Sequence, residues 1–166
     1  GRDGTLDNLW LDREVNSIDS WTGRGQLRWT PSDVTRLTVT AEHSEVDQES
    51  LFFETLKYND DALFVQVLDM VGLPRNEDPW DRDVYGDSEQ PETLDLSGYS
   101  ARLRTVIGEV GLTSITSYRE HDYSSFRDTD ASGVRWVYDG DPEEVDRFSQ
   151  EIRVAWSSTR ASLVAG

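Results

Sequence analysis

The chain has 166 residues, no cysteine and a formal net charge of −17. The negative charge argues against a nucleic-acid partner, because phosphate binding needs a basic stripe, and the missing cysteines exclude disulfides and thiolate metal sites. No apolar run reaches the ~20 residues of a membrane-spanning helix, although alternating barrel strands would escape that test.

Alternating polar and apolar residues predict β-strands along the whole chain. In chain order these strands cover residues 4–9, 21–29, 37–44, 99–105, 112–124, 148–156 and 161–166. Trp21 and Trp29 fall on one face of their strand, while Arg24 and Arg28 fall on the other. The chain shows no signal peptide and stops inside the last strand, so we expect both ends to be cuts in a longer protein.

The connections between these strands alternate between short and long. Tight turns rich in Pro, Gly, Ser and Asp are predicted at 30–33, 107–111 and 157–160. The long connections, about 48–93 and 125–146, together carry −14 of the −17 charges (12 acids with 3 bases, then 7 acids with 2 bases). Every second connection of an antiparallel meander lies at the same end of the sheet. The sequence therefore predicts the asymmetry of an outer-membrane barrel, with short periplasmic turns and long extracellular loops.

One helix is expected inside the first long connection. Asp60 and Asp61 would cap its start, Ala62–Val71 would form it, and Gly72 followed by Pro74 would end it. Such local structure would explain a loop of some 46 residues, which is otherwise too long for a compact domain.

The spacing of aromatic residues fits the thickness of a membrane. Trp21 and Trp29 are eight residues apart on one face, and so are Phe148 and Trp156. Eight residues span ~26 Å along a strand and ~20 Å along the axis of a tilted barrel, close to the ~25 Å apolar band between two aromatic girdles. A soluble β-sandwich alternates in the same way and remains the alternative.

In a transmembrane barrel, one set of alternating strand residues would face lipid and the other would face the lumen. The lipid-facing set would be Trp21, Gly23, Gly25, Leu27, Trp29, Leu37, Val39, Ala41, Tyr99, Ala101, Leu103, Phe148, Ile152, Val154 and Trp156. The lumen-facing set would include Arg24, Arg28, Glu42, Arg102, Arg104, Glu151 and Arg153, which we expect to pair with each other and with a plug. A charge on the lipid face near mid-membrane costs ~2–4 kcal/mol, so the charged set belongs on the wet wall.

Three motifs resemble the TonB-dependent outer-membrane receptors, and they occur in that family's order. Phe148–Val154 reads FSQEIRV and is similar to the family's FSQE(L/I)R(L/V) strand. Gly108–Tyr118, GEVGLTSITSY, resembles the turn and strand before it. Arg24–Ser32, RGQLRWTPS, resembles the family's RGQLR-x-TPS strand and turn. These motifs are specific for the family and say little about a ligand.

The resemblance implies an all-β fold: an incomplete antiparallel up-and-down transmembrane β-barrel, with about seven strands of a barrel of roughly 22. Residues 1–166 would then be part of one barrel domain, without its plug. The implied function is TonB-energised uptake of a scarce ligand, such as a ferric siderophore, across the outer membrane of a Gram-negative bacterium. The implied partners are the TonB complex, through a missing N-terminal region, and outer-membrane lipid and lipopolysaccharide. No cofactor is expected. A passive porin, or a soluble β-sandwich module for adhesion or carbohydrate binding, is the alternative.

Ligand recognition is expected in the acidic loops. The candidate aromatic residues there are Trp80, Tyr85, Trp136 and Tyr138. Packing within the loops, or contact with lipopolysaccharide, is the alternative role of each. No catalytic set emerges, because His43 and His121 lie on different strands without a nucleophile motif, and we do not expect an enzyme.

A calcium loop is a further candidate. Asp128, Asp130, Ser132 and Asp139 stand at positions 1, 3, 5 and 12 of a D-x-D-x-S-G pattern, with Gly133 at position 6. The last ligand is Asp rather than the usual bidentate Glu, and no helices flank the loop, so a solvated acidic turn is the alternative. A second acidic cluster, Asp78, Asp81, Asp83 and Asp87, has Tyr85 where a middle ligand should stand.

Overall fold

The structure is a computed structural model that describes residues 1–49, 52–53, 57–75, 78 and 80–166. The chain divides into two compact units. The first comprises Gly1–Ser20, Val46–Leu94 and Tyr123–Pro142, and the second comprises Trp21–Glu45, Asp95–Asp122 and Glu143–Gly166.

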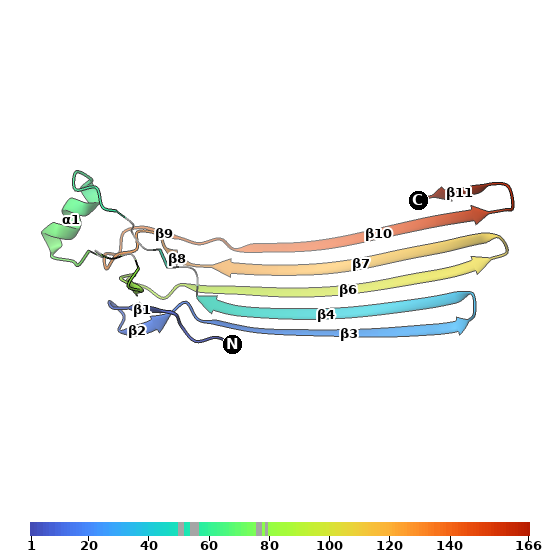
Figure 1. Ribbon diagram of the computed structural model, residues 1–166, viewed down its shortest axis with the longest axis horizontal. Coiled ribbons are helices and arrows are strands. Elements are labelled where there is room, and N and C mark those ends of the chain that lie inside the picture. Colours follow the sequence, from blue (N-terminus) through green and yellow to red (C-terminus); the bar gives the residue numbers. More distant parts are fainter. Residues whose placement is uncertain (50–51, 54–56, 76–77, 79) are drawn as a thin grey trace. The chain divides into compact units, whose positions relative to one another are not determined.

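The second unit is built on one antiparallel sheet (Figure 1). Its six strands lie in the order β11-β10-β7-β6-β4-β3, which is their order along the chain. The sheet is therefore a meander, with β3 and β11 at its edges. The strands are β3 (Ile18–Ser32), β4 (Thr35–Glu49), β6 (Pro91–Ile107), β7 (Val110–Ser125), β10 (Glu143–Ser157) and β11 (Ser162–Ala165). Tight turns join β3 to β4, β6 to β7 and β10 to β11 at one end of the sheet, as predicted. The first of them lies at residues 33–34, because residues 30–32 of the predicted turn continue β3. Gly108 takes a positive φ of 62° in the second of them.

The long strands extend beyond the predicted segments. Each of the five has 15 to 17 residues, whereas the alternation marked out between 7 and 13. In Glu45–Glu49 and Pro91–Asp95 most of the added residues are polar, with Val46 and Leu94 as isolated apolar positions, so no sustained alternation marks them. The last predicted strand, 161–166, is confirmed as β11, in which Ala165 pairs with Val154 of β10.

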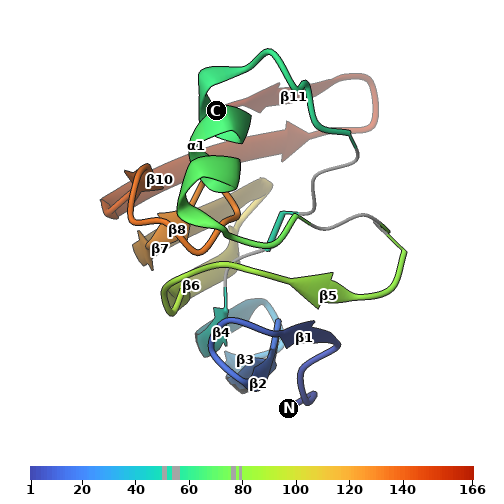
Figure 2. The same cartoon turned by 90° about the vertical axis from the view of Figure 1, so that its left-hand side faces the viewer.

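The first predicted strand, 4–9, does not join the six-stranded sheet. Its central part is β1 (Leu6–Asn8), which pairs antiparallel with β2 (Arg13–Val15) and parallel with β5 (Asp83–Val84) in a sheet of the first unit (Figure 2). The expected meander of about seven strands is therefore corrected to six in the described part of the chain.

The Asn8 side chain explains why β1 ends early. Its Oδ1 accepts hydrogen bonds from the backbone N–H groups of Trp10 and Leu11, at 2.9 and 3.0 Å. Its Nδ2 donates to the Gly86 carbonyl at 2.9 Å. This side chain thus closes a turn after β1, because Asn readily offers its amide oxygen to nearby N–H groups.

The helix α1 (Leu63–Val71) confirms the predicted element, and Gly72 ends it with a φ of 72°. The predicted caps at the start of the helix, Asp60 and Asp61, are wrong. Ala62 occupies the N-cap and makes no side-chain capping bond, while the Asp60 carboxylate accepts a hydrogen bond from Arg75 at 2.8 Å. No described helix has both the length and the hydropathy that crossing a membrane requires.

The second long connection carries a short hairpin of its own. Its strands are β8 (Arg127–Asp128) and β9 (Tyr138–Asp139), which pair antiparallel. With β1, β2, β5 and α1 they make up the regular structure of the first unit.

The buried apolar side chains among the described residues all belong to the first unit. They are Val15, Phe52, Val65, Leu68 and Val84. By contrast, the described strands of the six-stranded sheet bury no large apolar side chain: Leu27 is 70% exposed and Phe148 is 67% exposed. The long sheet is therefore formed without a hydrophobic core of its own.

Leu68 tests the small core beneath α1. We expect Leu68→Ala to cost about 2–4 kcal/mol of local stability, because this side chain is 1% exposed and its removal leaves a cavity. Met70→Ala, on the same helix at 78% exposure, is the matched control and should change little. Hydrogen exchange of residues 63–72 in the full-length protein would measure both, and equal protection in the two variants would contradict this packing.

Candidate functional site

The two faces of the six-stranded sheet have different chemistry, and side-chain contacts fix which residues share a face. On one face Thr22 meets Ser44 at 2.8 Å, and Ser117 meets Ser149 at 2.7 Å. Because strand residues alternate, this face also carries the predicted charged set: Arg24, Arg28, Glu42, Arg102, Arg104, Glu151 and Arg153. The opposite face carries the predicted apolar set of fifteen residues from Trp21 to Trp156. We refer to these as the polar face and the apolar face.

Aromatic rings are frequent on the apolar face. The Trp21 ring lies 5.6 Å from the His43 ring, and the Trp156 indole N–H donates to Glu109 at 3.1 Å. Trp21, Trp29, Tyr99, Phe148 and Trp156 are between 36% and 67% exposed. These rings therefore present both apolar surface and, at Trp156, a polar edge.

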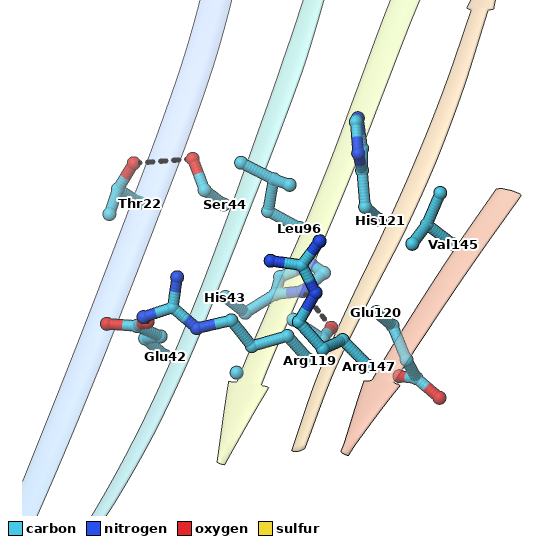
Figure 3. A pocket seen from close by; sticks show the side chains of 12 residues that line it. Thr22, Glu42, His43, Ser44, Leu96, Arg119, Glu120, His121, Val145 and Arg147 are labelled. Carbon is cyan, nitrogen blue, oxygen red and sulfur yellow. Dashed lines mark hydrogen bonds and ion pairs between the residues drawn. The ribbon is translucent and has the colours of Figure 1, made fainter. Parts of the chain in front are cut away.

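A pocket of about 370 Å³ opens on the six-stranded sheet, toward the strand ends that lie away from the tight turns (Figure 3). Across it the Arg119 guanidinium of β7 lies 3.6 Å from the Glu42 carboxylate of β4. The strand between them, β6, has Gly98 at this level, and a Cβ there would stand 2.8 Å from Glu42 Oε1. The missing side chain of Gly98 thus leaves room for an ion pair that spans three strands.

The two histidines do not form a joint site, although both border this pocket. His43 follows Glu42 and so lies on the apolar face, whereas His121 lies two residues beyond Arg119 and shares the polar face. A shared metal or a catalytic pair of histidines is therefore ruled out by the sheet itself.

His43 instead gathers two carboxylates on the apolar face. Its Nε2 lies 2.9 Å from Glu45 Oε1, its Nδ1 lies 3.0 Å from Ser97 Oγ, and Asp95 completes a group whose ligand atoms all lie within 4.8 Å. A divalent ion that accepts nitrogen and oxygen would find three ligands here. Both ring nitrogens already have hydrogen-bond partners, however, so the arrangement is complete without a metal.

The predicted calcium residues serve the backbone of their own loop. Asp128 Oδ1 accepts from the N–H groups of Asp130 and Ala131, at 3.1 and 3.3 Å, and its Oδ2 accepts from Asp87 at 3.1 Å. Asp130 accepts from the Ser132 hydroxyl and from the Val137 N–H.

The fourth predicted ligand lies with another partner. Asp139 pairs with Arg127 at 3.3 Å, and Arg127 also pairs with Asp141 at 2.7 Å. Among the described residues, the carboxylates of Asp128, Asp130 and Asp139 do not form a group that could surround one ion. The loop is a turn held by internal hydrogen bonds, and at 1% exposure Asp128 is buried rather than solvated.

The four candidate loop aromatics have different surroundings. Trp80 is 84% exposed, while Tyr85 is partly buried, and burial with Asp83 and Asp81 raises the pKa of its hydroxyl. Trp136 packs edge-on against Phe64 at 5.8 Å and borders a pocket of about 540 Å³. Of the four, Trp136 therefore combines partial exposure with a concave surface, which a ligand contact requires.

Tyr138 has a structural role. Its hydroxyl donates to both carboxylate oxygens of Asp87 at 2.8 Å, and its ring stacks on Phe126 at 5.3 Å. The backbone N–H of Phe126 in turn donates to the carbonyl of Pro91, the first residue of β6. Tyr138 is thus linked to the start of β6 through Phe126.

Sequence reasoning missed the Glu42–Gly98–Arg119 arrangement and the His43 group. A His-x-Glu pair inside an alternating strand places both side chains on one face, and this signal could have drawn attention to His43 and Glu45. The pairing of β4 with β6, which brings Asp95 and Gly98 beside them, joins residues some 50 positions apart and has no local signal.

Comparison with known proteins found no matching family model, no matching curated protein and no matching solved structure. The resemblance to TonB-dependent receptors therefore rests on the three motifs in the sequence.

Asp128 gives this region a pH dependence. Burial of this 1% exposed side chain raises its pKa to about 6, against the opposing effect of the N–H groups it accepts from. Because the folded loop favours the protonated acid, we expect stability to be greatest below the unfolded pKa of about 4 and to fall as the pH rises through 6. The loss should reach at most about 3 kcal/mol.

The measurement is hydrogen exchange of the Asp87 and Asp130 amides at pH 4.5 and 7.5, corrected for intrinsic rates. Asp128→Asn should flatten the difference, because an amide does not titrate. A pH dependence that persists in Asp128→Asn would show that another group causes it.

Proposed function

We propose that this chain forms part of the wall of an outer-membrane β-barrel receptor, which takes up a scarce ligand with energy from the TonB complex. The observation that carries the proposal is the apolar face of the six-stranded antiparallel sheet, which is rich in aromatic residues and left exposed.

Exposure of this face would be costly in water. Leu27, Trp29, Phe148 and Ile152 are each more than half exposed on it. Apolar surface costs about 25 cal/mol for every Å² left in water, and soluble monomers rarely expose continuous apolar patches of more than a few hundred Å². Hydrocarbon chains of a membrane would cover such a face without a second protein layer.

The polar face supports the same assignment. It carries arginines, glutamates, Ser and Thr at the positions between the apolar residues, which is the alternation of a barrel with a wet interior. The tight turns all lie at one end of the sheet, and the two long acidic connections join the strands at the other. A meander with this asymmetry matches a barrel whose short turns face the periplasm.

A soluble β-sandwich fits these observations less well. A sandwich packs a second sheet about 10 Å away against the apolar face. In the described residues the remaining sheets have three strands and two strands, and both belong to the first unit. The strand order leaves β3 and β11 as edges, so a closed barrel would require strands other than these six.

The choice of a TonB-dependent receptor over a passive porin is supported by the three motifs. Arg24–Ser32 falls on the second half of β3, Gly108–Tyr118 on the turn and first half of β7, and Phe148–Val154 on β10. The motifs therefore lie on three strands of the six-stranded sheet and on one of its tight turns. A ferric siderophore or a similar scarce ligand is the proposed cargo, with the loop aromatics, Trp136 foremost, as its contacts.

The location in the cell tests the proposal directly. We expect the full-length native protein to fractionate with the outer membrane and to migrate faster on a gel unheated than after boiling, because a closed barrel resists detergent. A protein found in the soluble fraction with no heat-dependent shift would end the proposal.

Neighbouring residues on β6 test which face meets lipid. Leu103→Arg should impair barrel assembly, because a buried charge near mid-membrane costs ~2–4 kcal/mol, whereas Arg102→Leu on the opposite face should have a mild effect. Folding into detergent micelles, followed by the heat-dependent gel shift, measures both variants. The reverse order of effects would overturn the assignment of the faces.

A further inference from the structure

Five arginines gather in one place on the polar face. They line a pocket of about 320 Å³ that extends over β3, β4, β6 and β7. The arginines are Arg24, Arg28, Arg36, Arg102 and Arg104. The other lining residues are Gln26, Thr38, Thr40, Ser100 and Ile115. We refer to this site as the arginine pocket.

The sheet brings these side chains together by simple geometry. Arg24 and Arg28 are four residues apart on β3, and Arg102 and Arg104 are two apart on β6, so each pair projects from one face. Neighbouring strands lie about 4.8 Å apart, which places guanidinium groups of adjacent strands within reach of one small ligand.

None of these five guanidinium groups has an acidic partner. In the described part of the chain they make no ion pair or hydrogen bond, and no Asp or Glu lines the pocket. Two other arginines of the same face do pair, Arg119 with Glu42 and Arg153 with Glu151, whereas Arg147 makes no ion pair in the described residues. The chain has 33 acidic residues, so a shortage of acids does not explain the difference.

In the described residues these arginines do not pair with other charged residues of this face, so that part of the expectation is wrong for them, while pairing with a plug stays a prediction. Five like charges placed together repel one another, and this repulsion falls when an anion binds among them. The pocket is lined by hydrogen-bond donors with Ile115 as its single apolar residue, so an apolar ligand would find little contact there.

We propose that the arginine pocket binds a small multivalent oxyanion, of the phosphate or polycarboxylate class. Guanidinium groups donate paired N–H bonds that match the oxygens of phosphate and carboxylate groups. The hydroxyls of Thr38 and Ser100 offer further donors at the pocket wall. The inference concerns the polar face alone and does not depend on what covers the apolar face. Where the proposed function also holds, the pocket would stand on the interior wall and would favour anionic cargo.

The experiment is calorimetric titration of the full-length protein, purified in detergent, with pyrophosphate and with citrate at low ionic strength. We expect binding of at least one of these anions to the unaltered protein. In the Arg28→Gln/Arg102→Gln double variant the dissociation constant should be at least tenfold higher, because two charge-assisted contacts are lost. Arg153→Gln is the matched control, since Arg153 lies on the same face outside the pocket and already pairs with Glu151.

Each outcome decides the proposal. Absence of binding by both anions in the unaltered protein, or equal weakening by Arg153→Gln, would overturn it. Binding of a hexaglutamate peptide without binding of pyrophosphate or citrate would also overturn it, in favour of a polypeptide partner. Far-ultraviolet circular dichroism reports folding, whether or not the protein is a membrane barrel. If the double variant fails to fold, Arg104→Gln is titrated instead, with about threefold weaker binding expected. A soluble protein that still binds the anions would refute the proposed membrane function and leave the pocket intact.

Discussion

The structure depends on the burial of apolar side chains, and the six-stranded sheet does not achieve that burial by itself. Strand alternation separates its side chains into an apolar face and a polar face. Backbone hydrogen bonds, the ladder bonds, join neighbouring strands in the plane of the sheet. Each ladder bond contributes only about 1 kcal/mol of net stability in water, because it replaces a bond that the unfolded backbone makes to solvent. A larger favourable term would come from covering Leu27, Phe148 and their neighbours, as the proposed membrane would do.

The first unit, by contrast, buries a small cluster of apolar side chains. Val15, Phe52 and Val84 pack into one cluster between the short strands, with Leu6 against it. Polar side chains hold the rest: Asn8 closes the turn after β1, and Asp128 gathers three backbone N–H groups. An acidic region that would otherwise repel itself is thereby given defined structure. Its carboxylates act as acceptors for the loop backbone, which leaves them less suited to hold a metal.

The fold was largely predictable, because alternation is a local property. The strands around Trp21, Leu37, Tyr99 and Phe148, the three tight turns and the helix ended by Gly72 were all visible in the sequence. The strand at 4–9 was assigned to the wrong sheet, because its pairing with β5 involves residues more than 70 positions away. The arginines were placed on the right face, but their concentration in one pocket follows from the pairing of β4 with β6 across a long connection.

The edges of the sheet carry a consequence for handling this molecule. β11 covers only Val154–Ser157 of β10, so residues 143–153 and the outer side of β3 offer long rows of backbone donors and acceptors without a neighbouring strand in the described chain. Such rows template the addition of any extended polypeptide, including another molecule of the same sequence. A sample of this chain should therefore tend to associate edge to edge into insoluble ribbons, and blocking the free edge of β10 should reduce that association.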